Sequence, residues 1–528
     1  MNKETRYLWL FLLVFLTISP IARATENGWI NIVEEGASNK GEKCTAIIRA
    51  TIEKASRNGG GTIYFPPGEY LTGALELKSN ITLHLDAGAV LKFSTDFDDY
   101  LPFVKMRWEG TVMKNFSPLI YANNAENIAI VGRGKIDGQG KAWWTEMYRI
   151  ELAEEEMPLT KYQKLWKEQN NGLETAQYYQ RTMNLMFFRP PLFQAFKSKN
   201  ILIEGITIVN APFWTINPAF CENVTITGVT IFNPPSPNTD GINPTSCRNV
   251  HISNCHISVG DDCITIKSGR DMNGREWATP AENITITNTT MLSGHGGIVI
   301  GSETSGGIKK VTISNCIFDG TNRGIRLKSA RGRGGIVEEI RVSNIVMKNI
   351  KNAAIVFNLY YDKGTNEESV TERTPVFRNI HISNLTATNV NKAGMIRGIS
   401  EMPVQNLSFS NINIEAKEGF EIHTAENIEF HDVKVTAENG PSFEIEDSHN
   451  IILDNVKSDK PLKDEPFIKI KNVFNMMVHS NFPMIFTDTF LEADGLKTNN
   501  VFLSNNVFTN VKNVIKRGDE LNKDAIID

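Results

Sequence analysis

One pattern of apolar and polar positions recurs along most of the chain. From about residue 80 onward an Asn precedes alternating β-branched and polar residues, as in KNILIEG (199–205), ENVTITG (222–228), ENITITN (282–288) and RNIHISN (378–384). Alternation at period two places successive side chains on opposite faces, which is typical of a strand with one buried face. Copies lie roughly 20 to 40 residues apart, a spacing that indicates stacked structural repeats.

A repeat this short cannot bury a core alone, so its copies must stack. Because almost no helical periodicity separates the copies, we predict an all-β fold, a right-handed parallel β-helix, with residues 25–528 as a single domain. Cys255, Thr289 and Cys316 occupy equivalent places in SNC, TNT and SNC. We expect these small residues to stack in the interior, which favours reduced cysteines over disulfides.

Two segments depart from the repeat. In Cys44–Gly61 the residues Ala46, Ile47, Ala50, Ile52 and Ala55 fall at helical spacing, which predicts a capping helix over the open N-terminal end of the stack. Residues 141–181 are rich in Glu, Lys, Trp and Tyr and lack period-two alternation. We expect a helical insertion on the surface there.

The N-terminus is typical of an exported protein. Lys3 and Arg6 precede the apolar run Leu8–Ile18 and a small-x-small site at Ala22–Ala24, so we predict a signal peptide over residues 1–24. An uncleaved anchor is the alternative, although the run is short for a membrane span. We expect a secreted or periplasmic protein with no membrane association after cleavage.

Composition excludes some partners. The formal net charge of −5 indicates neither a nucleic acid nor an acidic membrane as partner. Six cysteines in 528 residues are too few for a disulfide-built scaffold. We expect a monomer.

Four motifs interrupt the repeat, each about one coil after the last. They are NTDG (238–241), GDD (260–262), GHG (294–296) and RLK (326–328). Each alone is an ordinary turn or polar strand face. Rungs of a parallel sheet lie roughly 4.8 Å apart, so the register would gather Asp240, Asp261, Asp262, His295, Arg326 and Lys328 in one patch.

Three carboxylates beside three potential cations suit two reactions. Hydrolysis of a glycosidic bond needs a carboxylic acid for the leaving oxygen and a carboxylate to activate water. Calcium-assisted elimination from a uronide would instead use the carboxylates as metal ligands. Between Cys263 and Gly334 the sequence has ten Lys or Arg and only five Asp or Glu. This local surplus of positive charge fits an anionic sugar as the substrate of either reaction.

The motifs NTD, GDD, GHG and RLK, in this order and spacing, resemble those of family 28 glycoside hydrolases, the polygalacturonase family. The resemblance extends to GGGTIYFPPGEYLTGALELKSNITLHL (59–85) and VNAPFWTINP (209–218). It implies inverting hydrolysis of α-linked galacturonic acid in pectic polysaccharide or oligogalacturonide, with neither metal nor cofactor. Asp261 would be the general acid, while Asp240 and Asp262 would hold and deprotonate the water.

The resemblance also implies roles for the neighbouring residues. His295 would keep Asp261 protonated or orient it, and Arg326 and Lys328 would bind the substrate carboxylate. Leu327 stands where the family motif most often has Ile. Further substrate contacts are expected at Asn238, Lys267, Arg270, Tyr360 and Tyr361, although packing of a loop explains the two tyrosines equally well.

The insertion at 141–181 and GSETSGG (301–307) resemble those of exo-acting bacterial members, which favours removal of terminal sugars. Endo action and a rhamnogalacturonan-directed hydrolase are the alternatives within the family. Outside it, the alternatives are a calcium-dependent pectate lyase and a non-enzymatic β-helical protein that binds carbohydrate.

Overall fold

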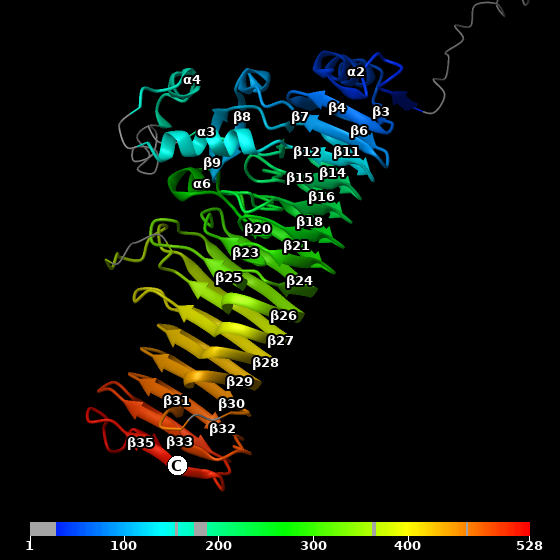
Figure 1. Ribbon diagram of the computed structural model, residues 1–528. Helices are drawn as coiled ribbons and strands as arrows, with labels where there is room; N and C mark the ends of the chain where they lie inside the picture. The colour runs from blue at the N-terminus through cyan, green and yellow to red at the C-terminus, as the bar shows by residue number, and fades with distance from the viewer. Residues whose placement is uncertain (1–27, 154–156, 174–186, 362–365, 461–462, 528) are drawn as a thin grey trace, which may run out of the picture.

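The computed structural model describes residues 28–153, 157–173, 187–361, 366–460 and 463–527, and the predicted signal peptide lies outside them. Parallel strands stack coil upon coil from the N-terminal end to the C-terminal end (Figure 1). The predicted right-handed parallel β-helix is confirmed. Each complete coil contributes to three faces. The chain runs first along the face that we call the middle face, then along the face that we call the third face, and last along the front face.

Among the described residues thirteen separate strands begin on the middle face, and the ninth of them continues onto the third face. They are β1 (Trp29–Asn31), β3 (Gly61–Phe65), β6 (Ile81–Leu85), β11 (Glu126–Gly132), β14 (Lys199–Glu204), β16 (Glu222–Thr227), β18 (Arg248–Ser253), β21 (Ala281–Thr287), β24 (Ile308–Asp319), β30 (His449–Asp454), β32 (Phe474–His479), β34 (Asn499–Ser504) and β36 (Ile526–Ile527). The third face holds β2 (Lys40–Lys43), β4 (Gly68–Thr72), β7 (Ala89–Phe93), β12 (Lys135–Asp137), β15 (Thr207–Val209), β17 (Thr230–Phe232), β19 (His256–Ser258) and β22 (Thr290–Ser293).

The front face carries the strands that follow. They are β5 (Leu75–Leu77), β10 (Ile120–Asn123), β13 (Phe193–Phe196), β20 (Ile264–Ile266), β23 (Ile298–Gly301), β25 (Arg323–Lys328), β31 (Pro466–Lys471), β33 (Thr487–Asp494) and β35 (Val511–Arg517). Four long strands run around all three faces, β26 (Ile336–Asn358), β27 (Val376–Arg397), β28 (Val404–His423) and β29 (Ala425–Glu446).

The repeated Asn has a structural cause. Asn200, Asn223 and Asn249 adopt the left-handed backbone conformation, with φ of 54°, 58° and 57°, which Asn tolerates better than most residues. Their side-chain amides donate to one another in a ladder, from Asn223 Nδ2 to Asn200 Oδ1 at 3.0 Å and from Asn249 Nδ2 to Asn223 Oδ1 at 3.1 Å. The ladder therefore fixes the corner at which each coil enters the middle face.

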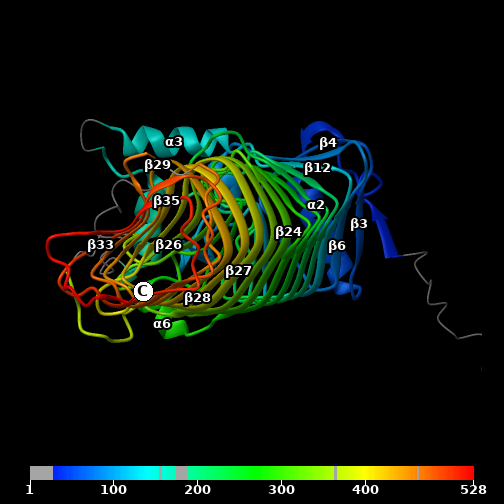
Figure 2. The ribbon, with the colours of Figure 1, turned by 90° about the horizontal axis from the view of Figure 1, so that it is seen from below.

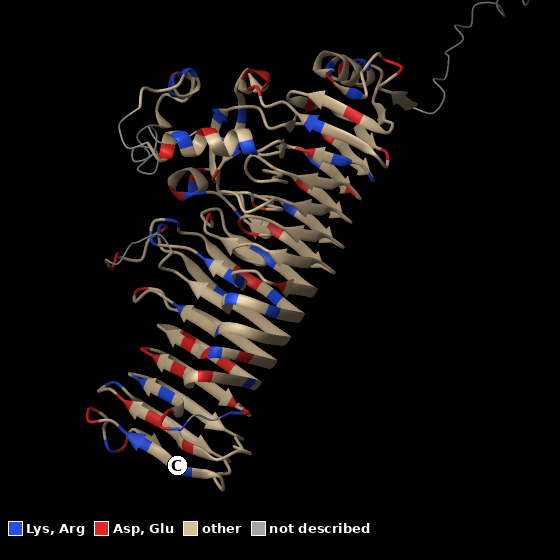
Figure 3. Ribbon diagram, viewed as in Figure 1, with Lys and Arg blue, Asp and Glu red and all other residues tan. Residues whose placement is uncertain are grey.

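The interior is a stack of aliphatic side chains in register. On the front face Ile242 pairs with Ile264, Ile264 with Ile298, and Ile298 with Ile325, and all four are buried. All six cysteines are buried and free, as predicted for Cys255 and Cys316. Neighbouring coils are joined on the outside by ion pairs, and bands of both charge signs occur on adjacent strands (Figure 3).

Helices lie at the ends and edges of the stack. The predicted cap is α2 (Thr45–Arg57), but its buried face is Ile48, Thr51, Ile52 and Ala55. The expected face was wrong in part, because Ala46 and Ala50 are exposed. Positions 48, 51, 52 and 55 follow the i, i+3, i+4, i+7 spacing of one face, so Ile48 takes the place expected for Ile47.

The insertion is helical where the structure describes it, with α3 (Lys141–Glu151) and α4 (Lys161–Gln169). The part of the prediction at 174–181 lies outside the described residues. Three elements were not predicted: the 3-10 helix η2 (Phe97–Tyr100), the antiparallel hairpin β8 (Val104–Trp108) and β9 (Thr111–Asn115), and the short helix α6 (Asp271–Trp277). In Figure 2, α3 and α6 lie at opposite edges of the coils.

Candidate active site

The four motifs lie on consecutive coils where each chain segment enters or follows the front face. Asp240 precedes Ile242 by two residues, and Asp262 precedes Ile264 by two residues. The pairing then continues from β20 to β23 and from β23 to β25, where Val299 lies opposite Arg326. The spacing of about one coil per motif is therefore the spacing of adjacent rungs.

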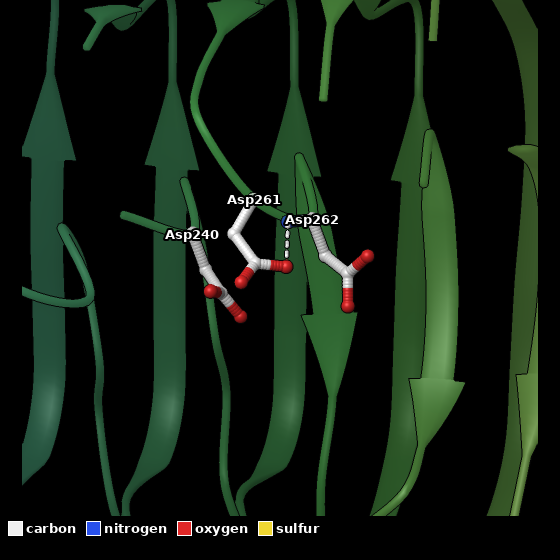
Figure 4. Close-up of side chains that lie close together, drawn as sticks. All are labelled: Asp240, Asp261 and Asp262. Atoms are coloured by element: carbon white, nitrogen blue, oxygen red, sulfur yellow. Dashed lines mark hydrogen bonds between the residues drawn. The ribbon is translucent and has the colours of Figure 1, made fainter. Parts of the chain in front are cut away.

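The three aspartates form one cluster. Each of Asp240, Asp261 and Asp262 offers an oxygen atom, and these atoms lie within 4.8 Å of one another (Figure 4). Asp240 and Asp262 are buried, with exposed fractions of 3% and 1%, whereas Asp261 is partly exposed. The cluster thus has two carboxyl groups at its base and one at the surface.

Glycines permit the close approach of the loops that carry this cluster. A Cβ at Gly260 would lie 2.2 Å from the carbonyl oxygen of Ser236, and a Cβ at Gly294 would lie 2.6 Å from that of Asp261. A side chain at Gly296 would approach Asp262 Oδ1 to 3.1 Å. Close packing of neighbouring loops therefore requires glycine on both sides of the aspartates.

Asp262 lies between two cations. Lys328 Nζ lies 2.8 Å from Asp262 Oδ2, and Arg326 Nη1 lies 3.9 Å from Asp262 Oδ1. Burial alone would raise the pKa of Asp262, but Lys328 and Arg326 outweigh it and lower the pKa, so this carboxyl is ionised. Among the described residues no donor forms a hydrogen bond to Asp262 Oδ1.

Asp240 has the opposite electrostatic environment. Asn243 Nδ2 donates to its Oδ2 at 2.8 Å, and the Thr265 hydroxyl lies 3.4 Å from the same oxygen. Burial is the main cause that raises the pKa of Asp240 well above its ordinary value, and repulsion from Asp261 is the second. The pKa values of the two buried carboxyl groups therefore differ, so that Asp262 is ionised and Asp240 favours the protonated form.

Asp261 is held by a backbone amide and by His295. The Asp262 N–H donates to Asp261 Oδ1 at 2.9 Å, and His295 Nδ1 lies 3.1 Å from the same oxygen. This hydrogen bond, opposed by burial, raises the pKa of His295. Since Oδ1 is engaged, Oδ2 is the Asp261 oxygen that remains for a proton directed outward.

The other expected cations are already paired. Lys267 Nζ lies 2.8 Å from Glu303 Oε2 and 4.6 Å from the Trp214 ring centroid, and this ion pair is almost fully buried. Arg270 Nη1 lies 3.3 Å from Glu109 Oε2 on the turn of the β8–β9 hairpin. Glu303 was not predicted as a site residue, because its partner is brought to it only by the fold.

Asn238 is connected to the interior through Arg189, which was also not predicted. Arg189 Nη2 donates to Asn238 Oδ1 at 2.7 Å, and Nη1 donates to the Pro212 carbonyl at 2.8 Å. Trp144 Nε1 on α3 donates to the same carbonyl at 3.2 Å. The insertion and the NTD motif therefore share a hydrogen-bonded support.

Comparison with known proteins identifies the family. A model of "Glycosyl hydrolases family 28" matches residues 179–427, and one of "Rhamnogalacturonase A/epimerase, pectate lyase-like" matches residues 29–141. A probable polygalacturonase from Vitis vinifera is 33% identical over 371 residues, which are 69% of this chain and 68% of that protein. The chain belongs to glycoside hydrolase family 28.

Other relatives of this family 28 hydrolase are bacterial. An exo-poly-α-D-galacturonosidase from Dickeya chrysanthemi is 30% identical over 413 residues, covering 72% of this chain and 66% of that protein. The crystal structure of an exopolygalacturonase from Thermotoga maritima aligns with a TM-score of 0.66 and 34% identity, covering 76% of this chain and 91% of that one.

The two tyrosines expected as substrate contacts lie beside different cations. The Tyr361 ring centroid lies 5.3 Å from the Arg326 guanidinium carbon and 4.9 Å from Lys328 Nζ. Tyr360 instead lies over Arg331, at 5.2 Å. Both rings are 38% exposed. Tyr361 is therefore the one of the pair that shares the cations of the site.

The aspartates are also the only group of potential metal ligands found among the described residues. Calcium takes six to eight oxygen ligands, whereas this cluster offers three carboxylates with Lys328 already bound to one of them. The residues present therefore fit a calcium ion poorly. Within the described part of the chain, no helix is both long and apolar enough to cross a membrane.

Proposed function

We propose that this family 28 hydrolase removes terminal galacturonic acid from α-linked galacturonan in pectic material, with inversion of configuration. The ionised, buried Asp262 carboxylate beside partly exposed Asp261 carries the proposal. Arg326 and Lys328 supply the positive charge that a uronate requires. The names of the relatives in Vitis, Dickeya and Thermotoga support this substrate class.

Asp261 acts as the general acid. Its Oδ1 accepts from the Asp262 amide and faces His295, so Oδ2 presents the proton to the glycosidic oxygen. His295 orients the carboxyl group by this contact. A protonated imidazole would stabilise the ionised carboxylate, so orientation fits the geometry better than keeping Asp261 protonated.

Asp262 acts as the base, and Asp240 helps to hold the water. The nearest oxygens of the cluster lie within 4.8 Å of one another, shorter than the roughly 6.5–9.5 Å typical of inverting enzymes. Burial argues for inversion nonetheless. An aspartate that is 1% exposed cannot approach an anomeric carbon directly, so its carboxylate would act through a water molecule held at Oδ1, which accepts no hydrogen bond from the described residues.

Exo action is supported by the walls around the site. The insertion is anchored at Pro212 beside Arg189, and the β8–β9 hairpin, which bonds to Asn170 of the insertion through Lys114, extends to Arg270. Joined elements of this kind, added beside a site, can close one end of a groove, so they favour binding of a chain end. Residues 1–24 support export, so we place the mature hydrolase outside the cytoplasm as one β-helical domain.

Chromatography of products from polygalacturonate over time tests the proposal. Galacturonic acid alone from the first minutes is the expected result. A ladder of oligomers at early times would instead establish endo action. Lack of any product would contradict the substrate class.

A further inference from the structure

A concave site lies beside α3, and none of the three aspartates is among the residues that line it. The pocket has a volume of about 660 Å³, within the roughly 300–1,000 Å³ of small-molecule sites. Its floor is formed where the third-face strands β7, β12 and β15 end, and α3 forms its wall. The lining residues include Phe97, Asp137, Gln139, Lys141, Trp144 and Asn210. None of the site residues discussed above except Trp144 takes part.

Two aromatic rings border this pocket, and each is fixed by the fold. Phe97 packs against Trp143, Phe116 and Phe187 with ring centroids 4.5, 6.4 and 5.1 Å away. Trp144 is held by its hydrogen bond to the Pro212 carbonyl. Both rings are partly exposed. Rigid aromatic faces with a polar partner nearby provide contact area at low cost in conformational entropy.

Polar groups from two neighbouring coils converge between the rings. Asp137 Oδ1 accepts from Asn210 Nδ2 at 2.9 Å and from the Gln139 backbone amide at 3.1 Å. These contacts fix both side chains, yet no hydrogen bond from another described residue reaches Asp137 Oδ2 or Asn210 Oδ1. Two fixed acceptors at the pocket floor match adjacent hydroxyl groups of a sugar.

The charge of the pocket differs from that of the aspartate site. The residues that line the pocket include two acids, Asp137 and Glu146, and one cation, Lys141. Glu146 also forms an ion pair with Arg149, outside the lining, at 2.7 Å. No surplus of positive charge is present to attract a uronate. The pocket therefore suits an uncharged ligand rich in hydroxyl groups.

We propose that this pocket binds a neutral saccharide, such as an uncharged side chain of branched pectin. The choice of pectin as the source rests on the proposed function, whereas the neutral-sugar chemistry rests on the pocket alone. Binding there would hold a branched substrate on the hydrolase without taking part in bond cleavage.

The test is calorimetric titration of the full-length protein with neutral galactotriose and arabinotriose, with trigalacturonate as the charged comparison. Thr95 is exposed at the pocket rim, so Thr95→Trp should fill the pocket. Asn210→Gly removes the amide at a residue with φ of 54°, which glycine adopts readily. Matched controls are Thr312→Trp on exposed β24 and Asn505→Gly, whose φ is also 54°.

At least one neutral trisaccharide should bind the wild type and both controls, and its affinity should fall at least tenfold in both pocket variants. Hydrolysis of unbranched polygalacturonate should be unchanged in all four. Absence of neutral-sugar binding to the wild type would overturn the proposal. A raised KM for polygalacturonate in Thr95→Trp would also overturn it, because the pocket would then belong to the main site. Failure of the proposed function would appear separately, as no hydrolysis by the wild type.

Discussion

The ion pair of Lys328 with Asp262 determines which carboxyl group of the aspartate cluster is ionised. The two groups are 2.8 Å apart, and their side chains are 7% and 2% exposed. Lys328→Met removes the charge and keeps most of the volume. Arg326 remains, but at 3.9 Å from the carboxylate.

Removing one partner of a buried ion pair costs about 3–5 kcal/mol, because the remaining charge is left uncompensated. Since Arg326 retains part of the compensation, we expect the lower end of this range, about 3 kcal/mol. At about 1.4 kcal/mol per pKa unit, the pKa of Asp262 should rise by about two units. The base would then be protonated over a wider range of acidic pH.

The assay is release of reducing sugar from polygalacturonate as a function of pH. In Lys328→Met the acid limb of kcat/KM should move upward by about two pH units. Lys516→Met is the matched control, because its pair with Glu492 is also short, at 2.7 Å, but Lys516 is 64% exposed. Exposed pairs contribute about 0–1 kcal/mol, so the control should resemble the wild type. An unchanged acid limb with only a raised KM would refute the reasoning and leave Lys328 as a substrate contact.

Three further predictions follow from the site. Asp261→Asn should lower kcat by about 10²–10⁴-fold with little change in substrate affinity, and equal turnover would exclude Asp261 as the general acid. The pKa of Glu303 is lowered to about 2, because Lys267 and other cations outweigh its burial. A lowered pKa contributes stability that is present above the unfolded pKa of about 4.3 and is lost as pH falls towards 2, so Glu303→Gln should flatten this acid dependence in urea unfolding. A chelator should leave activity unchanged, whereas its loss together with absorbance of an unsaturated product would indicate a calcium-dependent lyase.

The β-helix and the register of the site were predictable because both follow from short-range periodicity. Alternation at period two predicts each strand, and Asn marks a corner at which the backbone takes a left-handed conformation. Once each repeat is one coil, NTDG, GDD, GHG and RLK must lie on adjacent rungs. The sequence also predicted that Cys255 and Cys316 are buried and reduced, for the same reason.

The supporting network was not predictable in this way. Arg189, Glu303 and the β8–β9 hairpin lie in loops without periodicity, and their partners are distant in the chain. Near-complete burial of Asp240 and Asp262 was also unforeseen, because it results from close packing of the loops around Gly260 and Gly296. The local pattern predicted the residues proposed for the site, whereas loop packing determines the charge states of the aspartates among them.

The stereochemical course of hydrolysis tests the proposed roles of the three aspartates most directly. Proton NMR during the first minutes of digestion of polygalacturonate by the wild type distinguishes the anomers before they interconvert. Water activated by Asp262 predicts that the newly released galacturonic acid appears first as the β-anomer. First appearance of the α-anomer would contradict this mechanism, because retention requires a covalent intermediate on a carboxylate rather than direct attack by water.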